Sequence, residues 1–347
     1  NFDWRLGLFG WFDLEGSNVT RNLGFLDQQA ALRFVHEHIA AFGGDPNRVT
    51  LEGQSEGCGI ILTHMTSPGS KGLFHRVAFH SPVADVWSRH VDGDRTKFMI
   101  EQSGCKRKEL WSTMRCLERK TARHLWYQDW VSESLSRNVG SPTFMSAVSH
   151  LLKFALESPH KNETAGTLGY HPIPDGRNIP GEARDLIREG KFHNVPMLIT
   201  VSPNETYGII PEGYEIGLNL VSRLVMNRSN VEAVQEEYNS TLLATGVHLD
   251  RVKLINQLVT DKVFTCDARS LANEMTRHGG KVHVGMFWKS PKYDPVGKMT
   301  SGVCNKGAVC HAAEMFYVLP QGKPIGVHFQ KGMEAEAEFV DRYHTSF

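Results

Sequence analysis

The sequence predicts an α/β fold in which a mostly parallel sheet is wrapped by helices and carries a large helical insertion. Strand-like and helix-like segments alternate over the first ninety residues, and two further strand-like segments recur after residue 190, with mainly helical patterns between them. The chain has 347 residues, a length that large α/β proteins reach as one unit. We therefore expect a single domain over residues 1–347, with the helical insertion at roughly 85–170.

The expected elements follow one another along the chain. The opening residues, NFDWRLGLFGWF, are aromatic and aliphatic and indicate a buried strand. Residues 27–42 place apolar side chains at helical spacing behind Asp27, a candidate N-cap, and Gly43-Gly44 ends that helix. Strands are expected at residues 48–53, 75–81, 195–201 and 281–288, and a second helix at 57–67.

Composition and charge restrict the classes of partner. Hydrophobic residues make up 40% and charged residues 22% of the chain, which is typical of globular proteins and excludes disordered or fibrous chains. The formal net charge is zero, and the basic runs at 106–108 and 119–120 are short enough to be ordinary solvated surface, so we expect no nucleic-acid partner. No apolar run approaches the ~20 residues of a spanning helix, so no membrane-spanning segment is expected.

Sequons and cysteines indicate a secreted or lumenal protein. Five N-x-[ST] tripeptides occur, at Asn18, Asn162, Asn204, Asn227 and Asn239. Two pairs of the six cysteines bracket short segments: Cys105 with Cys116, and Cys304 with Cys310. Each pair can close a small disulfide loop in an oxidising compartment.

The other cysteines and a metal site call for separate interpretations. Cys58 fits a small buried thiol better than a second nucleophile, and Cys266 has no evident partner in the chain. A zinc site at Cys304, Cys310 and His311 would lack a fourth ligand and any C-x-x-C pair. We therefore expect neither a metal site nor another cofactor.

The stretch VTLEGQSEGCG contains a G-x-S-x-G motif with Ser55 at its centre. A strand is expected before the motif and a helix after it, which is the context that a nucleophile elbow requires. A sharp turn there lifts the serine hydroxyl above the sheet edge and directs the backbone N–H of Glu56 at a developing oxyanion. A serine also needs a histidine base and an orienting carboxylate, which follow the serine in the order acid, then histidine in α/β-hydrolases.

The chain resembles the type-B carboxylesterase and cholinesterase family over most of its length. The resemblance begins at AAFGGDPNRVTLEGQSEG and continues through SPGSKGLFHRVAFHS, PIPDGRNIP, LIREGKFHNVPMLITVSPNETYG, CDARSLANEMTRHGGKVHVGMFW and CHAAEMFYV. This collinear series is more specific than any single motif. It implies the α/β-hydrolase fold and a small-molecule carboxylic ester as substrate.

The resemblance also implies roles for individual residues. Ser55 matches the nucleophile of the family, Glu205 the acid and His311 the histidine, while Glu314 matches the glutamate that follows that histidine. The Cys105–Cys116 loop matches a family disulfide, and Cys266 matches a cysteine whose usual partner lies close to the C-terminus. The implied mechanism passes through an acyl-enzyme, with backbone N–H groups, including that of Glu56, binding the oxyanion.

Three departures separate this chain from the family pattern. Gln54 stands where the family carries a glutamate, and Glu56 stands where it carries a small residue, so a carboxylate adjoins the oxyanion site. The glycine-rich segment that supplies further oxyanion donors precedes the first strand in the family; we expect it in a missing N-terminal part or on a separate chain. The NET sequence around Glu205 creates a sequon at Asn204, which we expect to be unmodified because a glycan beside a buried acid would be hard to accommodate.

Two hypotheses therefore stand. The first is a secreted serine ester hydrolase with the triad Ser55, His311 and Glu205. The second is a weakly active or inactive cholinesterase-like protein, resembling neuroligins, that binds a protein partner or dimerises through the helical surface of the family. Retention of all three triad residues favours the first, since such relatives commonly lose the serine. The substituted elbow favours the second.

Overall fold

We describe the chain from a computed structural model that covers residues 2–14, 16–83, 96–97, 99–128, 172–207, 231–244, 246, 250–291, 304 and 307–318. The chain forms two compact units. The first unit comprises Asn1–Val49, Leu62–His75 and Asp85–His193, and the second comprises Thr50–Ile61, Arg76–Ala84 and Asn194–Phe347. Most of the expected helical insertion, with Asn162, and the sequon at Asn227 lie outside the described residues.

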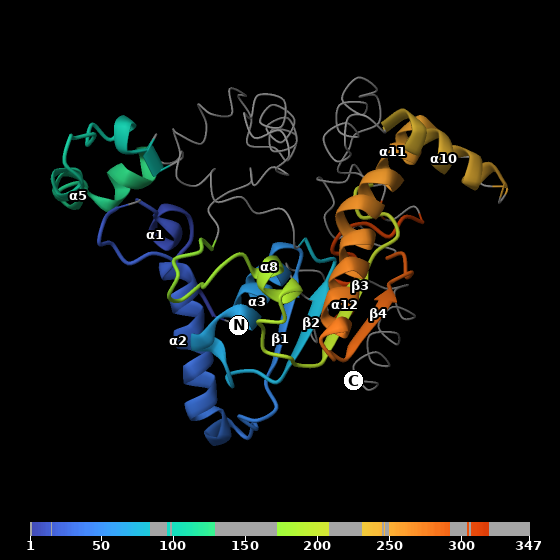
Figure 1. The fold of residues 1–347 in the computed structure, drawn as a ribbon, viewed down its shortest axis with the longest axis horizontal. Coiled ribbons are helices and arrows are strands. Elements are labelled where there is room, and N and C mark those ends of the chain that lie inside the picture. The colour runs from blue at the N-terminus through green and yellow to red at the C-terminus, as the bar shows by residue number, and fades with distance from the viewer. Residues whose placement is uncertain are drawn as a thin grey trace, which may run out of the picture. The chain divides into compact units, whose positions relative to one another are not determined.

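The second unit is built on a four-stranded parallel sheet with the strand order β1-β2-β3-β4 (Figure 1). Its strands are β1 (Thr50–Gln54), β2 (Arg76–His80), β3 (Met197–Val201) and β4 (Val282–Met286). All four strands expected in this part of the sequence, and their parallel pairing, are confirmed. Because parallel strands end at one edge of the sheet, the residues that follow β1, β2 and β3 lie together.

Helices of the second unit continue the alternation with strands. They are α10 (Val231–Ala244), α11 (Arg251–Thr260), the π-helical turn η3 (Asp261–Thr265), α12 (Cys266–Arg277) and α13 (Met315–Val318). Helix α12 lies beside β4 and buries Leu271 and Met275. On the strands, Phe79 and Ile199 are fully buried, which makes this layer the core of the unit.

The first unit is mainly helical in the residues that the structure describes. It contains α1 (Gly7–Trp11), α2 (Leu23–His38), η1 (Ile39–Phe42), η2 (Pro68–Ser70), α5 (Leu110–Glu118) and α8 (Ala183–Arg188). Helix α3 (Glu56–Thr66), predicted from its sequence, begins in the second unit and ends in the first. Within these ranges we find no helix with the length and apolar character needed to cross a bilayer.

Two sequence-based expectations for the N-terminal region are wrong. The opening residues contain helix α1 instead of a buried strand. At Gly10 an added Cβ would lie 2.1 Å from the carbonyl oxygen of Arg5, so the chain is more tightly folded there than in a strand. An apolar run of this length does not distinguish a buried helix from a strand. Gly10 permits the close approach to Arg5 because it has no Cβ.

The second correction concerns the start of α2. The helix begins four residues before Asp27, after Asn22, whose φ is 57°. Asp27 binds the guanidinium of Arg5, with Nε at 2.8 Å from Oδ2, and this hydrogen bond lowers the pKa of the carboxyl. At the far end the α-helix changes to a 3-10 turn, and Phe42, which fits the helical spacing in sequence, is 75% exposed.

A buried polar network lies inside the first unit around His64. Its Nδ1 lies 2.8 Å from Oγ of Ser70 and its Nε2 lies 3.0 Å from Oε1 of Gln28, while Phe25 stacks on the ring at 4.3 Å. Burial of the imidazole disfavours the cation and lowers the pKa of His64 to about 3. The imidazole of His64 is therefore neutral in the folded state at neutral pH.

We expect this network to make the protein acid-labile. The unfolded chain binds a proton at His64 below its ordinary pKa of 6.5, whereas the folded state resists protonation down to about pH 3. Stability therefore falls as pH falls through this window, by at most about 1.4 kcal/mol per pH unit for one proton. Urea unfolding at pH 4.5, 5.5 and 6.5 measures how the free energy of unfolding changes with pH. That change per pH unit should be smaller for His64→Gln than for the wild type. His36→Gln, at an exposed position, is the matched control. If the free energy of unfolding changed equally with pH in the two variants, His64 would not be the source of the acid lability.

Candidate active site

Ser55 sits at a sharp turn between β1 and α3. Its φ is +57°, in the left-handed region that non-glycine residues rarely adopt. The Ser55 N–H donates to the carbonyl of His80 at 2.8 Å, and the Ser55 carbonyl accepts from the N–H of Cys58 at 3.0 Å. The turn is thus held from both sides in the strained geometry expected of a nucleophile elbow.

The first glycine of the motif is required by a close backbone contact. A Cβ added to Gly53 would lie 2.7 Å from the carbonyl carbon and oxygen of Gly57, so no other residue fits there without a shift. A Cβ added to Gly57 would meet nothing within 4 Å. The motif therefore owes its first glycine to the tightness of the turn.

Glu205 and His311 form a carboxylate–imidazole pair at the end of β3. Nδ1 of His311 lies 2.7 Å from Oε2 of Glu205. The Glu205 side chain is fully buried, whereas His311 keeps 21% of its side-chain surface exposed. The backbone N–H of Ser202 donates to the second oxygen, Oε1 of Glu205, at 2.6 Å. Each carboxylate oxygen thus has a partner, as a buried anion requires.

Several neighbours fix the imidazole in place. The backbone N–H of His311 donates to the carbonyl of Glu205 at 3.3 Å, and the disulfide between Cys304 and Cys310 ends at the preceding residue. The ring of Phe264 lies 5.0 Å from the His311 ring. Phe264 belongs to the π-helical turn η3, and such turns occur frequently at functional sites.

The free nitrogen of His311 contacts Gln54 instead of the serine. When Nδ1–H is directed at Glu205, Nε2 is left as an acceptor. The side-chain amide nitrogen of Gln54 lies 2.9 Å from Nε2 and can donate to it. Among the described residues, Gln54 is the hydrogen-bond partner of this nitrogen, so the atom that would accept the Ser55 proton is already engaged.

A second buried carboxyl adjoins the pair. Glu314 is 2% exposed, and its two oxygens lie 3.4 Å from the hydroxyls of Ser81 and Ser202. Burial, and then the charge of nearby Glu205, raise the pKa of the Glu314 carboxyl. This environment favours its neutral form, which avoids two adjacent buried anions.

Sequence reasoning missed a further contact, between Glu52 and His80. Nε2 of His80 lies 2.9 Å from Oε1 of Glu52, and its Nδ1 lies 2.7 Å from the hydroxyl of Thr200. Glu52 and Gln54 are two apart on β1 and therefore share a face of the sheet, and His80 is the strand partner of Gln54. The sequence does show that Glu52 and Gln54 lie on the same face of β1. It does not show which residue of β2 they face, because that depends on the register of the two strands.

Glu56 opens helix α3, directly after the serine. Its side chain reaches solvent, yet the surrounding protein desolvates the carboxyl in part and raises its pKa. The helix N-terminus favours the anion there, which opposes the desolvation. A carboxylate therefore adjoins the place that the elbow provides for an oxyanion.

The predicted cysteine pairings agree with the structure. Disulfides join Cys105 to Cys116 and Cys304 to Cys310. Cys58 is a free buried thiol whose pKa is raised by burial, as suits a structural residue, and Cys266 is free and exposed. Among the sequons in the described residues, Asn18 and Asn239 are exposed, whereas Asn204 is half-buried and accepts from the backbone N–H of Val309 at 3.2 Å.

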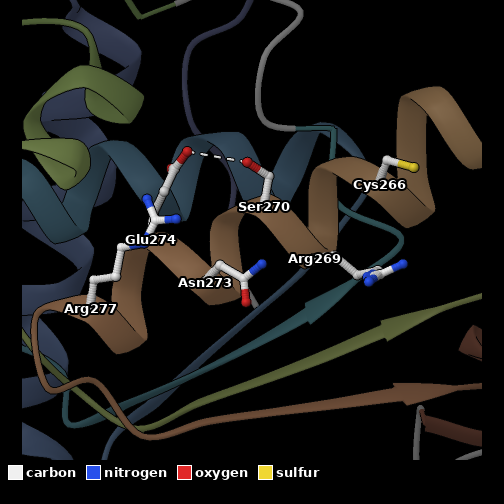
Figure 2. Close-up of a pocket in the computed structure, with 6 residues that line it drawn as sticks. All are labelled: Cys266, Arg269, Ser270, Asn273, Glu274 and Arg277. Atoms are coloured by element: carbon white, nitrogen blue, oxygen red, sulfur yellow. Dashed lines mark hydrogen bonds between the residues drawn. The ribbon is translucent and has the colours of Figure 1, made fainter.

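One pocket formed by the described residues lies along α12, outside the set of predicted triad residues (Figure 2). It has a volume of about 290 Å³ and is lined by Cys266, Arg269, Ser270, Asn273, Glu274 and Arg277. Ser270 donates to Glu274, one turn further along the helix, at 3.2 Å. Within the part of the chain that the structure describes, no group of three His, Cys, Asp or Glu side chains is placed to hold a metal ion.

The two glycines of the elbow provide a matched test of its geometry. Gly53→Ala should lower the free energy of unfolding by about 1–3 kcal/mol or more, because its Cβ overlaps the Gly57 backbone. Gly57→Ala, in open space within a helix, should be neutral or stabilising by less than about 1 kcal/mol. Urea unfolding of both variants compares them directly. Similar losses in the two would contradict the tight contact.

Comparisons with known proteins identify the family. A model of the carboxylesterase family matches residues 1–347. An acylcarnitine hydrolase of Rattus norvegicus is 29% identical over 67% of the chain, and an acetylcholinesterase of Leptinotarsa decemlineata is 25% identical over 95% of it. Neuroligin-2 of Rattus norvegicus is 28% identical over 61% of the chain.

The chain spans only part of the length of these relatives: 35% of the acylcarnitine hydrolase, 51% of the acetylcholinesterase and 22% of neuroligin-2. Its parallel sheet and its match to the family model over the whole length show that the chain belongs to the carboxylesterase family, whose fold is that of the α/β-hydrolases.

Proposed function

We propose that the protein is a serine carboxylic ester hydrolase that acts through an acyl-enzyme. The observation that carries the proposal is the Glu205–His311 pair at 2.7 Å, in the same unit as a serine whose φ of +57° places it on an elbow. The names of two relatives, an acylcarnitine hydrolase and an acetylcholinesterase, support the same class of reaction. The substrate would be a small-molecule ester.

In the proposed mechanism His311 removes the proton of Ser55 as the hydroxyl oxygen attacks the ester carbonyl carbon. Glu205, buried and hydrogen-bonded to Nδ1, holds the imidazole and stabilises its cation. The backbone N–H of Glu56 donates to the tetrahedral oxyanion. The imidazolium then protonates the leaving alcohol, and water repeats the sequence to release the acid and free Ser55.

Gln54 must yield its contact for this reaction to begin. Nε2 of His311 can accept the serine proton only when the Gln54 amide, at 2.9 Å, no longer donates to it. Exchange of one hydrogen bond for another changes the free energy by about 1 kcal/mol. We therefore propose that, in the resting enzyme, the Gln54 amide and the Ser55 hydroxyl compete for Nε2 of His311.

A secretory setting belongs to the same proposal. Both disulfides are stable in an oxidising compartment, and the exposed Asn18 and Asn239 are suitable glycan acceptors. We propose a secreted or lumenal protein.

The alternative is a weakly active or inactive binding protein on the same fold. Two observations favour it: Gln54 occupies the base, and the carboxylate of Glu56 adjoins the oxyanion site. Neuroligin-2 among the relatives supports the same class. Such a protein would bind a protein partner or dimerise through its helical surface.

Covalent labelling separates the two functions. A fluorophosphonate probe should label the natural protein once, at Ser55, with no labelling of Ser55→Ala. Labelling of His311→Gln should be slower by at least about 10²-fold because the general base is lost. Peptide mass spectrometry of the labelled protein identifies the site.

His36→Gln, on the exposed surface of α2, is the matched histidine control and should label like the wild type. An unlabelled natural protein would overturn the hydrolase and favour the binding protein. Labelling at a serine other than Ser55 would refute the assignment of the nucleophile.

The competition by Gln54 predicts opposite effects of two substitutions. Gln54→Ala should label a few-fold faster at neutral pH, since about 1 kcal/mol of competing hydrogen bond is removed. Gln54→Glu places a carboxylate against Nε2 and stabilises the imidazolium, so the acid limb of the labelling rate should move to higher pH. The pH dependence of the labelling rate measures both effects.

Gln102→Glu is the matched charge control, because Gln102 is exposed and belongs to the first unit. Its pH profile should coincide with that of the wild type. Slower labelling of Gln54→Ala would show that Gln54 holds the imidazole productively, and that result would refute the competition.

A further inference from the structure

Helix α5 joins the two basic runs of the sequence into one stripe. Between Cys105 and Gln128 the chain has seven Lys or Arg residues and two Glu residues, in a protein whose formal net charge is zero. Lys108, Trp111, Arg115 and Arg119 follow one another at intervals of three or four residues, which places them on one helix face and its flanks. We call these four residues the α5 stripe.

The stripe is exposed and held in place. Its three cations are exposed, and Trp111 has 63% of its surface accessible. The guanidinium carbon of Arg115 lies 5.2 Å from the centre of the Trp111 ring, within the range of a cation–π contact. The disulfide between Cys105 and Cys116 closes the loop that leads into the helix and constrains the backbone that carries the stripe.

The charges of the stripe are not neutralised by neighbours. Within the described residues, no carboxylate forms an ion pair with Lys108, Arg115 or Arg119. The adjacent cations differ in this respect, because Lys106 pairs with Glu101 and Arg107 donates to the carbonyls of its own loop. Glu118 on the same helix offsets part of the charge.

We propose that the α5 stripe is a binding site for a sulfated polysaccharide. A linear polyanion matches a row of cations along a helix, where four residues correspond to about 6 Å. Arg115 covers one face of the Trp111 ring, and the exposed remainder of the ring offers apolar surface for a sugar ring between charge contacts. This site lies outside the residues of the proposed esterase and does not depend on that activity.

Other anionic partners fit the stripe less well. The opposite face of α5 is buried, with Leu117 in the core of the first unit. Leu110 and Trp111 are the exposed large apolar side chains on this nine-residue helix, which is a smaller apolar surface than a membrane-inserting helix presents. The disulfides indicate an oxidising compartment, where nucleic acid is not the common polyanion. An acidic protein segment would supply charge, but it would lack the regular series of sugar rings that a polysaccharide presents to Trp111.

The test measures binding of the full-length protein to heparin fragments as the probe. The wild type should bind, with an affinity that falls steeply as salt rises. The triple variant Lys108→Gln, Arg115→Gln and Arg119→Gln should bind at least about 10-fold more weakly, a loss of the size that several exposed charge contacts produce together. Trp111→Ala should also weaken binding, and Trp111→Phe should restore part of it.

A second triple variant removes the same charge elsewhere. Arg33→Gln, Lys71→Gln and Lys281→Gln change three exposed cations and should leave the affinity within about 2-fold of the wild type. Equal losses in both triple variants would refute a defined site. The proposal would also be overturned by absent heparin binding at physiological salt. Binding to desulfated heparin, anionic vesicles or polyglutamate that matches binding to heparin would overturn it as well.

Discussion

The buried carboxylate of Glu205 is the constraint on which much of the second unit depends. An ionised carboxyl without water must find hydrogen-bond donors inside the protein, or its burial becomes strongly unfavourable. Ser202 and His311 provide those donors, at 2.6 and 2.7 Å. The turn after β3, the disulfide loop before His311 and the aromatic contact of Phe264 are each placed so that these two donors stay aligned. The neutral character favoured at Glu314 follows from the same demand, since a second buried anion would compete for the same donors.

Much of the fold followed from periodicity, and much of the site from chain order. Four strands and the helix after the serine were predicted because short β-branched runs between turn signals are distinctive. Ser55, Glu205 and His311 were predicted from their order and from the family resemblance. Glu205 and His311 lie 2.7 Å apart, and the catalytic roles of the three residues stay a prediction. The N-terminal strand was a wrong prediction, because a short apolar run has no period that separates helix from strand.

Contacts between strands could not be predicted in the same way. The approach of Glu52 to His80 depends on the register of β1 with β2, and that of Gln54 to His311 depends on the tertiary placement of the loop that carries His311. Neither is encoded locally. The α5 stripe illustrates the converse case. Its spacing is visible in sequence, but its meaning depends on which cations are already paired and on which face of the helix is buried.

The contact between Gln54 and His311 has an evolutionary consequence. Codons for glutamine and glutamate differ at a single base, and the surrounding elbow, disulfide loop and buried acid need no adjustment for such a change. The scaffold that positions the imidazole of His311 is therefore separate from the side chain that contacts its Nε2. A lineage could exchange the amide beside the imidazole for a carboxylate by point mutation, while the fold and any surface used for binding stay under separate selection.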